Sequence, residues 1–150
     1  MDELKVGYNT GSTQYIVIKI GEEEYGINIS YVENISRMVH ITRVPKVQPY
    51  LRGVINLRGE VIPVMSLRLK MGLADDVYTK ATRIIILKLE QHGTIGIIVD
   101  QVREVVTLEE SQIEKVINEG PQEKFVTSVG KCENGLVSLL DLNVVALEKE

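Results

Sequence analysis

The sequence predicts an all-β fold made of a pair of small β-barrels. Short apolar runs rich in β-branched residues recur along the 150-residue chain, separated by Gly, Pro and Asn turns. This spacing is typical of small barrels, which leave few open sheet edges. An internal repeat supports a pair, because residues 26–35 align without a gap on residues 96–105, apolar on apolar. Chance similarity between β-rich segments is the alternative, since β-branched alternation recurs in any all-β protein.

The two halves are expected to share an interface, because a half of about 70 residues would bury too small a core alone. Residues 1–13 lack sustained periodicity and are expected to form a flexible tail. A Gly-Glu-Glu turn separates strands predicted at residues 15–20 and 25–29. Pro45 and Pro49 then bracket a loop.

Residues 53–64 form an apolar run that is broken once, at residues 56–59. Asn and Gly tolerate left-handed backbone conformations, so Asn56 and Gly59 fit a tight connection between two buried strands. Arg58 then lies near the tip, where its guanidinium offers five donors in a fixed fork. A hairpin turn with a solvated Arg is the alternative, because surface ion pairs are mostly weak.

A short helix follows this hairpin. Ser66 can cap the helix over residues 67–71, and Gly72 ends it. Residues 74–80 are predicted to be a loop. The remaining predicted strands occupy residues 84–89, 95–99, 102–108, 125–132 and 136–140.

The second half also has its own turns and a terminal helix. Residues 109–121 are acidic and weakly periodic, which predicts a loop with at most one helical turn. The Asn-Gly pair at 134–135 is a strong hairpin signal. Asp141 or Asn143 then caps a helix that runs to about Leu147.

Composition and charge exclude several classes of function. The net charge of −4 disfavours a nucleic-acid partner, for which a basic face would be needed. The opening residues lack the apolar region of a signal peptide, and no apolar run approaches the roughly 18 residues of a membrane span. A single cysteine, Cys132, agrees with a reducing compartment. We therefore expect a cytoplasmic protein with no direct membrane insertion.

The sequence offers no catalytic, metal or cofactor site. His40 and His92 are the only histidines, and neither has a second ligand at metal spacing. Cys132 falls in a predicted strand without a basic neighbour to activate it. Asp100 is expected at a strand end. These observations favour a binding protein over an enzyme.

Three motifs stand in order along the chain: Glu-Tyr-Gly-Ile-Asn-Ile at 24–29, Gly-Val-Ile-Asn-Leu-Arg-Gly-Glu-Val-Ile-Pro-Val at 53–64 and Gly-Ile-Ile-Val-Asp-Gln-Val at 96–102. Together they resemble the CheW family of bacterial chemotaxis adaptors. The resemblance covers a CheW-like domain at residues 14–147 and leaves 148–150 as a C-terminal tail. It implies two tandem five-stranded, SH3-like barrels and a noncatalytic adaptor that links chemoreceptor tips to the histidine kinase CheA in membrane-associated arrays. In this family the same domain closes CheA as its regulatory module.

The resemblance also implies two sets of contact residues. The receptor-facing groove would involve Gly53, Val54, Arg58, Gly59, Ile84, Gly96, Val99, Val102 and Val105. Kinase contact would involve Ile29, Val32 and Asn34 at the barrel ends, and a second surface near Glu114 to Glu119.

The chain departs from the family pattern at two of these positions. The family often places Glu where this chain has Asn34, and that Glu commonly pairs with the turn Arg. Either Arg58 pairs with Glu33 or Glu60, or it is free for a partner carboxylate. The family's basic residue near the second kinase surface is replaced by Glu114.

A different class of function is a small β-barrel that binds oligonucleotides or another ligand. Such a barrel should interleave aromatic and basic residues along one sheet face. Trp is absent here and Phe occurs once, so the sequence favours the adaptor.

Overall fold

The computed structural model describes residues 11–116, 123–133 and 135–146. The elements are β1 (Ser12–Ile20), β2 (Glu23–Asn28), η2 (Ile29–Tyr31), β3 (Val32–Arg37), β4 (Leu51–Leu57), β5 (Glu60–Ser66), α1 (Leu67–Lys70), β6 (Arg83–Leu89), β7 (Gly93–Val99), β8 (Gln101–Glu109), η3 (Glu110–Gln112), β9 (Ile113–Lys115), η4 (Glu123–Phe125), β10 (Val126–Cys132), β11 (Gly135–Leu140) and α2 (Leu142–Ala146).

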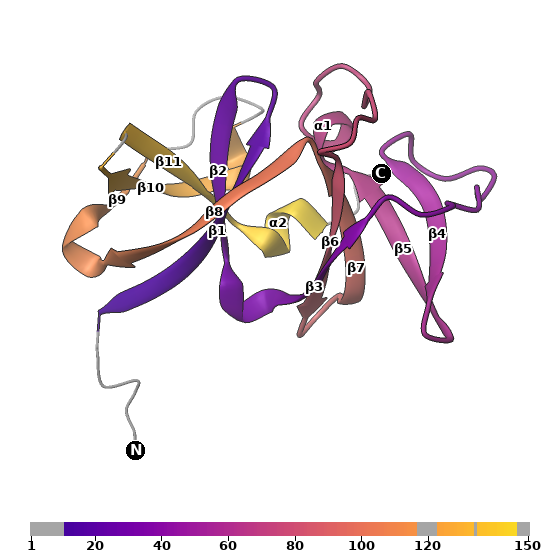
Figure 1. Ribbon diagram of the computed structural model, residues 1–150, viewed down its shortest axis with the longest axis horizontal. Helices are drawn as coiled ribbons and strands as arrows, with labels where there is room; N and C mark the ends of the chain where they lie inside the picture. The colour runs from indigo at the N-terminus through magenta and orange to yellow at the C-terminus, as the bar shows by residue number, and fades with distance from the viewer. Residues whose placement is uncertain (1–10, 117–122, 134, 147–150) are drawn as a thin grey trace.

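The strands form two sheets that lie side by side, with α2 between them (Figure 1). The six-stranded sheet has the order β8-β1-β2-β11-β10-β9, and the five-stranded sheet has the order β3-β6-β7-β5-β4. Neighbours are antiparallel except for the parallel pairs β11–β2 and β5–β7. Each sheet curls as an open, SH3-like barrel, so the predicted all-β class is confirmed.

The two sheets repeat one topology, and the first hairpins of the two halves are exchanged between them. In the five-stranded sheet, hairpin β6–β7 from the second half lies between β3 and β5 from the first. In the six-stranded sheet, hairpin β1–β2 from the first half lies between β8 and β11 from the second. The chain therefore crosses between sheets at residues 29–31 and again at Asp100.

The repeat that the sequence showed has matching register in the structure. Gly26 pairs in parallel with Leu139, and Gly96 pairs in parallel with Val64. A Cβ on Gly26 would lie 2.7 Å from Leu139 Cδ2, and a Cβ on Gly96 would lie 3.3 Å from Val64 Cγ2. Both glycines therefore allow the same close approach of a parallel neighbour.

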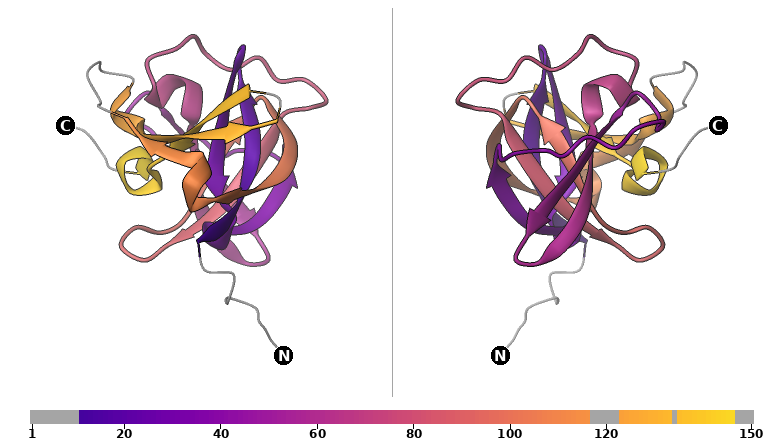
Figure 2. Two further views of the ribbon diagram at one scale, coloured as in Figure 1. Left: turned by 90° about the vertical axis from the view of Figure 1, so that its left-hand side faces the viewer. Right: turned by 90° about the vertical axis from the view of Figure 1, so that its right-hand side faces the viewer.

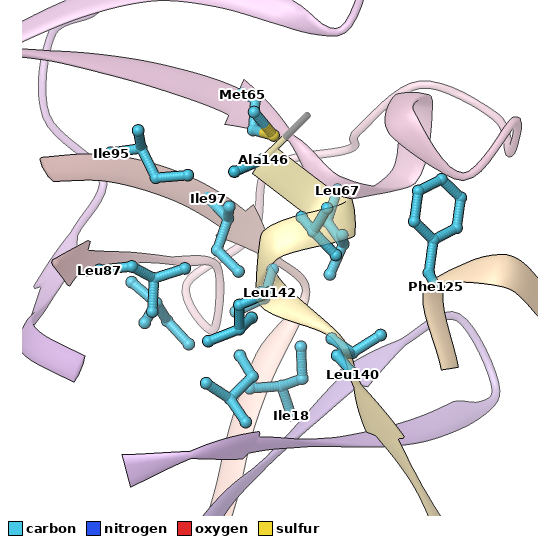
Figure 3. Packing of buried hydrophobic residues seen from close by; sticks show 14 of the residues in the cluster. Ile18, Met65, Leu67, Leu87, Ile95, Ile97, Phe125, Leu140, Leu142 and Ala146 are labelled. Atoms are coloured by element: carbon cyan, nitrogen blue, oxygen red, sulfur yellow. The ribbon is translucent and has the colours of Figure 1, made fainter. Parts of the chain in front are cut away.

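The largest hydrophobic cluster joins the two sheets. It includes buried side chains from β1 and β2 of one sheet and from β6 and β7 of the other. In Figure 3, Leu142 and Ala146 of α2 lie among residues of both sheets, including Ile18 and Leu87. Smaller clusters fill the five-stranded and six-stranded sheets separately. The shared core is the interface expected from the small size of each half.

Both short helices begin at side-chain caps, as the sequence predicted. Ser66 Oγ accepts a hydrogen bond from Leu69 N at 3.1 Å, and Asp141 Oδ1 accepts one from Val144 N at 3.3 Å. Asp141, and not Asn143, is therefore the cap of α2. Each helix thus leaves its parallel strand in the same way.

Some sequence predictions are corrected, and others lie outside the described residues. The segment after β8 was predicted to be a loop but contains strand β9, which pairs with β10 and gives one sheet six strands. Strand β1 begins at Ser12, inside the predicted tail. Predictions for residues 1–10, Asn134, Leu147 and 148–150 lie outside the described residues.

Candidate partner-binding surfaces

The β4–β5 turn presents Arg58 to solvent. Arg58 and Gly59 both have left-handed backbones, with φ of 54° and 82°. The sequence placed Asn56 in this conformation, but Asn56 is still paired in β4, opposite Val61, and its Oδ1 accepts a hydrogen bond from Gly59 N at 3.2 Å. Within the described residues Arg58 makes no ion pair with Glu33 or Glu60. Its guanidinium is therefore available to a partner.

Arg58 is a costly residue at this position. A non-glycine residue in a left-handed conformation lowers the free energy of unfolding by about 1 kcal/mol or more. Asn-Gly is the preferred pair in such two-residue turns. Because stability alone would favour Asn here, the exposed cation at the tip points to a role in recognition.

The start of the loop between β3 and β4 is held against Gly53 and Val54 of β4. Val54 and Thr42 exchange two backbone hydrogen bonds, each of 2.8 Å. Gly53 has φ of 145°, and a Cβ there would lie 2.1 Å from Thr42 O. The role of Gly53 visible in the structure is to admit this close contact.

The other residues assigned to the receptor-facing groove divide into interior and surface positions. Ile84, Gly96 and Val99 are buried. The side chains of Ile84 and Val99 pack in the interior, and none of the three residues offers a direct contact surface. Val102 is partly buried against the large cluster. Val105 is 50% exposed.

The residues assigned to the first kinase surface line the crossing between the sheets. Ile29 and Val32 are partly buried against the large cluster. Asn34 Oδ1 accepts a hydrogen bond from Ile35 N at 2.8 Å, and Ile35 is 39% exposed. Ile35, which sequence reasoning did not single out, is thus the more accessible apolar side chain of this strand.

Glu114, which the resemblance assigns to a second kinase surface, lies beside a compensating cation. Glu114 Oε2 lies 3.1 Å from Lys131 Nζ of the neighbouring strand, and both side chains are more than half exposed. Lys131 therefore supplies positive charge beside the position where the family's basic residue is replaced. Glu119 lies outside the described residues.

Two pairs of exposed apolar residues occupy matching positions in the two sheets. Val61 in β5 corresponds to Leu136 in β11, and they are 63% and 66% exposed. Ile35 in β3 corresponds to Val105 in β8. Of these residues sequence reasoning singled out Val105 alone, because the sequence does not show which face of a strand is exposed. Single exposed apolar side chains are ordinary on a protein surface, so the notable feature of these residues is that they recur at matching positions in the two sheets.

An ion pair fixes the second crossing between the sheets. Arg68 Nη2 lies 2.7 Å from Asp100 Oδ2, and Arg68 Nε lies 3.0 Å from Oδ1. Gly21 N donates to the same Oδ2 at 2.7 Å. Burial acts to raise the pKa of Asp100, but the hydrogen bonds and charge of Arg68 and the Gly21 N–H lower it overall. Sequence reasoning placed Asp100 at a strand end but missed Arg68.

The first crossing is fixed by a neutral group. Asn28 Oδ1 accepts hydrogen bonds from Ser30 N at 2.9 Å and from Ser30 Oγ at 2.8 Å. Ser30 and Asp100 align in the sequence repeat. Each crossing is therefore held by a local polar contact.

The described residues contain no group of three or more His, Cys, Asp and Glu side chains that could hold a metal ion. Burial raises the pKa of the Cys132 thiol, as do the Glu104 and Glu24 carboxylates, so the thiol is a poor nucleophile. None of the helices in the described ranges is long and apolar enough to cross a membrane.

The paired open barrels have exposed apolar positions on both sheets and a turn cation that pairs with no described residue, an arrangement that favours a protein-interaction module. A family model described as CheW-like domain matches residues 14–150. The chain is 40% identical to the chemotaxis protein CheW of Bacillus subtilis over 151 residues, which covers 99% of this chain and 92% of that protein. It is 34% identical over 128 residues to the chemotaxis protein CheW of Helicobacter pylori, with 85% and 77% covered.

A solved structure has the same architecture. The crystal structure of the scaffolding protein TtCheW from Thermoanaerobacter tengcongensis aligns with a TM-score of 0.82 and 30% identity over 89% of this chain and 91% of that one. The chain belongs to the CheW family.

Proposed function

We propose that this chain is a noncatalytic chemotaxis adaptor that couples the cytoplasmic tips of chemoreceptors to the regulatory domain of the histidine kinase CheA. In this role it acts in the cytoplasm, recruited to membrane-associated receptor arrays. The observation that carries the proposal is the matched exposure of Ile35 in β3 and Val105 in β8, which belong to the two different surfaces assigned below. An adaptor needs two binding ends, and the exchanged topology gives this chain two related ones.

The receptor-facing surface is assigned to Arg58, Gly59, Val54, Val102 and Val105. Interior residues Ile84, Gly96 and Val99, together with Gly53, would position it. Arg58 is suited to a carboxylate on the receptor, because its planar fork can form two parallel hydrogen bonds and no residue of the described chain occupies it.

One kinase-facing surface is assigned to Ile29, Val32, Asn34 and Ile35, at the first crossing and along β3. The second is assigned to Glu114 of β9 and to Glu119, which lies outside the described residues. Ile35 supplies exposed apolar area beside Asn34. The Glu114–Lys131 pair is solvent-exposed and can exchange for partner charges at little cost.

Reconstitution of receptor cytoplasmic fragment, CheA and this chain tests the proposal. Adding the chain should raise kinase phosphorylation and its response to receptor ligand. Ile35→Glu should weaken kinase binding, because it places a charge in an apolar contact, whereas Arg58→Ala should weaken receptor coupling. Val77→Glu is the matched control, since Val77 is 79% exposed and outside both surfaces.

Circular dichroism melts separate loss of binding from loss of folding. If the ternary mixture had the phosphorylation rate and ligand response of receptor and kinase alone, the adaptor role would be wrong. A folded Ile35→Glu variant with wild-type kinase affinity would remove only the assignment of that surface.

A further inference from the structure

The loop between β3 and β4 forms one wall of a groove of about 730 Å³ that is separate from the residues assigned above. The right-hand view of Figure 2 shows this loop running across the side of the molecule that carries β4 and β5. Val39, Val44 and Val47 of the loop are 44%, 37% and 38% exposed, and Tyr78 on the other side is 49% exposed. The groove thus offers a partner exposed apolar side chains interspersed with polar and charged ones.

The polar residues of the groove carry one sign of charge. Arg43, Lys46 and Arg52 line it together with His40, and no Asp or Glu is among the described residues that line it. Arg52 Nη1 lies 3.4 Å from Asp75 Oδ1 in an exposed pair. Arg43 and Lys46 have no ion-pair partner within the described part of the chain. This cationic patch lies on a chain whose net charge is −4.

The groove is shaped before any partner binds. The paired backbone bonds between Thr42 and Val54 anchor the start of the loop, and Pro45 and Pro49 stiffen its far side. Met38 and Ile41 pack against the core of the five-stranded sheet. A preformed loop lowers the ordering cost of binding, so a small interface can give measurable affinity.

We infer that this groove docks an acidic segment of a partner protein, in which Asp or Glu alternates with aliphatic residues. The aliphatic side chains would cover Val44, Val47 and Tyr78, and the carboxylates would meet Arg43 and Lys46. A nucleic acid fits less well, because valines in place of stacking aromatic residues line the site and the chain as a whole is anionic. The inference does not depend on the receptor and kinase assignments.

The test uses the full chain, labelled with ¹⁵N, and short synthetic peptides in which Glu and Asp alternate with Leu and Val. Titration should shift the amide signals of Tyr78 and of the non-proline residues in 38–49. Arg43→Glu combined with Lys46→Glu should weaken binding by about tenfold or more, because both carboxylate contacts become repulsive. Val47→Ser should weaken it by a smaller factor.

Matched controls separate docking from general charge effects. Lys88→Glu combined with Lys115→Glu makes the same charge change as the Arg43→Glu/Lys46→Glu variant, at exposed strand positions outside the groove. This double variant should leave the affinity for the acidic peptides within about twofold of the wild-type value. Peptides with Lys in place of the acidic residues should not bind.

Several outcomes would overturn the inference. They are the absence of shifts with every acidic peptide, equal binding by a folded Arg43→Glu/Lys46→Glu variant, and equal binding of the Lys-containing peptides. A short oligonucleotide that shifts the same signals at lower concentration than the peptides would also overturn it, because the occupant would then be a nucleic acid.

Discussion

The Arg68–Asp100 ion pair at the second crossing should stabilise the fold measurably, and a double-mutant cycle can isolate its contribution. The two side chains are 21% and 26% exposed and form two short hydrogen bonds. Arg68→Ala, Asp100→Ala and the double variant provide the cycle.

The expected coupling energy follows from burial and geometry. A charge-assisted hydrogen bond contributes about 1.5–3 kcal/mol when water is largely excluded, whereas an exposed ion pair contributes only about 0.2–1 kcal/mol. A two-bond pair at this intermediate exposure should couple by about 1–2 kcal/mol. Asp100→Ala should cost more than Arg68→Ala, because it also removes the acceptor of Gly21 N.

Urea unfolding of the four proteins at neutral pH measures the coupling as a free energy of unfolding. The Arg103–Glu24 pair is the matched control, since it spans 3.2 Å with side chains 43% and 34% exposed and should couple by less than about 0.5 kcal/mol. Additive effects of Arg68→Ala and Asp100→Ala within about 0.3 kcal/mol would refute the reasoning.

The pH dependence of the cycle has a definite sign. Because the folded state lowers the pKa of Asp100, its contribution is fully present above the unfolded-state pKa of about 3.9. It is lost as pH falls through the lower folded-state pKa. The coupling energy should therefore be constant from about pH 5 to 8 and disappear in stronger acid.

Three further predictions concern single positions. Asp76→Asn should raise stability by about 0.5–1 kcal/mol at neutral pH, because burial disfavours the charged carboxylate more than its side-chain interaction with Ser66 favours it. Burial, and then Asp75, raise the pKa of Asp76, so the loss of folding free energy caused by the charged carboxylate grows as pH rises through the folded-state pKa. Urea melts at acid pH should therefore show no stability gain for Asp76→Asn, and a gain there would contradict the prediction. Gly53→Ala should cost about 2–4 kcal/mol by thermal melting, and Gly59→Ala, which meets no atom within 4 Å, only about 1 kcal/mol; equal costs would contradict the steric account. Arg58→Asn should raise stability by about 0.5–1 kcal/mol in the same melts while weakening receptor coupling, and a loss of stability would show that the turn Arg is structural.

Local rules in the sequence predicted much of the fold. Ser66 and Asp141 predicted where the two helices begin, because a capping side chain accepts a hydrogen bond from a backbone N–H within three residues. The aligned segments at 26–35 and 96–105 predicted two like units. These features depend on short stretches of chain, so one sequence suffices to find them.

Pairing between distant strands was beyond such rules. The exchange of hairpins depends on whether β2 or β7 becomes the parallel neighbour of β5, and the two hairpins carry the same apolar pattern with Gly26 and Gly96 in matching places. Strand β9 is only three residues long, with the sequence Ile-Glu-Lys, so its pairing with β10 left no periodic signal. The exposure of Val61 and Leu136 also depends on tertiary packing, since a strand's apolar face is defined only by what packs against it.

The site assignments depended on the family pattern and on accessibility that the sequence does not contain. Arg58 was found because a break in an apolar run is visible in the sequence. Ile84 and Val99 belong to continuous apolar runs, and only the structure shows that neither side chain reaches the surface.

The exchange of hairpins has a mechanical consequence. Two separate domains joined by a flexible linker could bend at the linker. Here each sheet contains a hairpin from the other half of the chain, so bending one sheet against the other would require sheet hydrogen bonds to break. The angle between the two sheets is therefore fixed when the chain folds. In a repeating assembly, the fixed angle between the two sheets would set the spacing and curvature of the assembly.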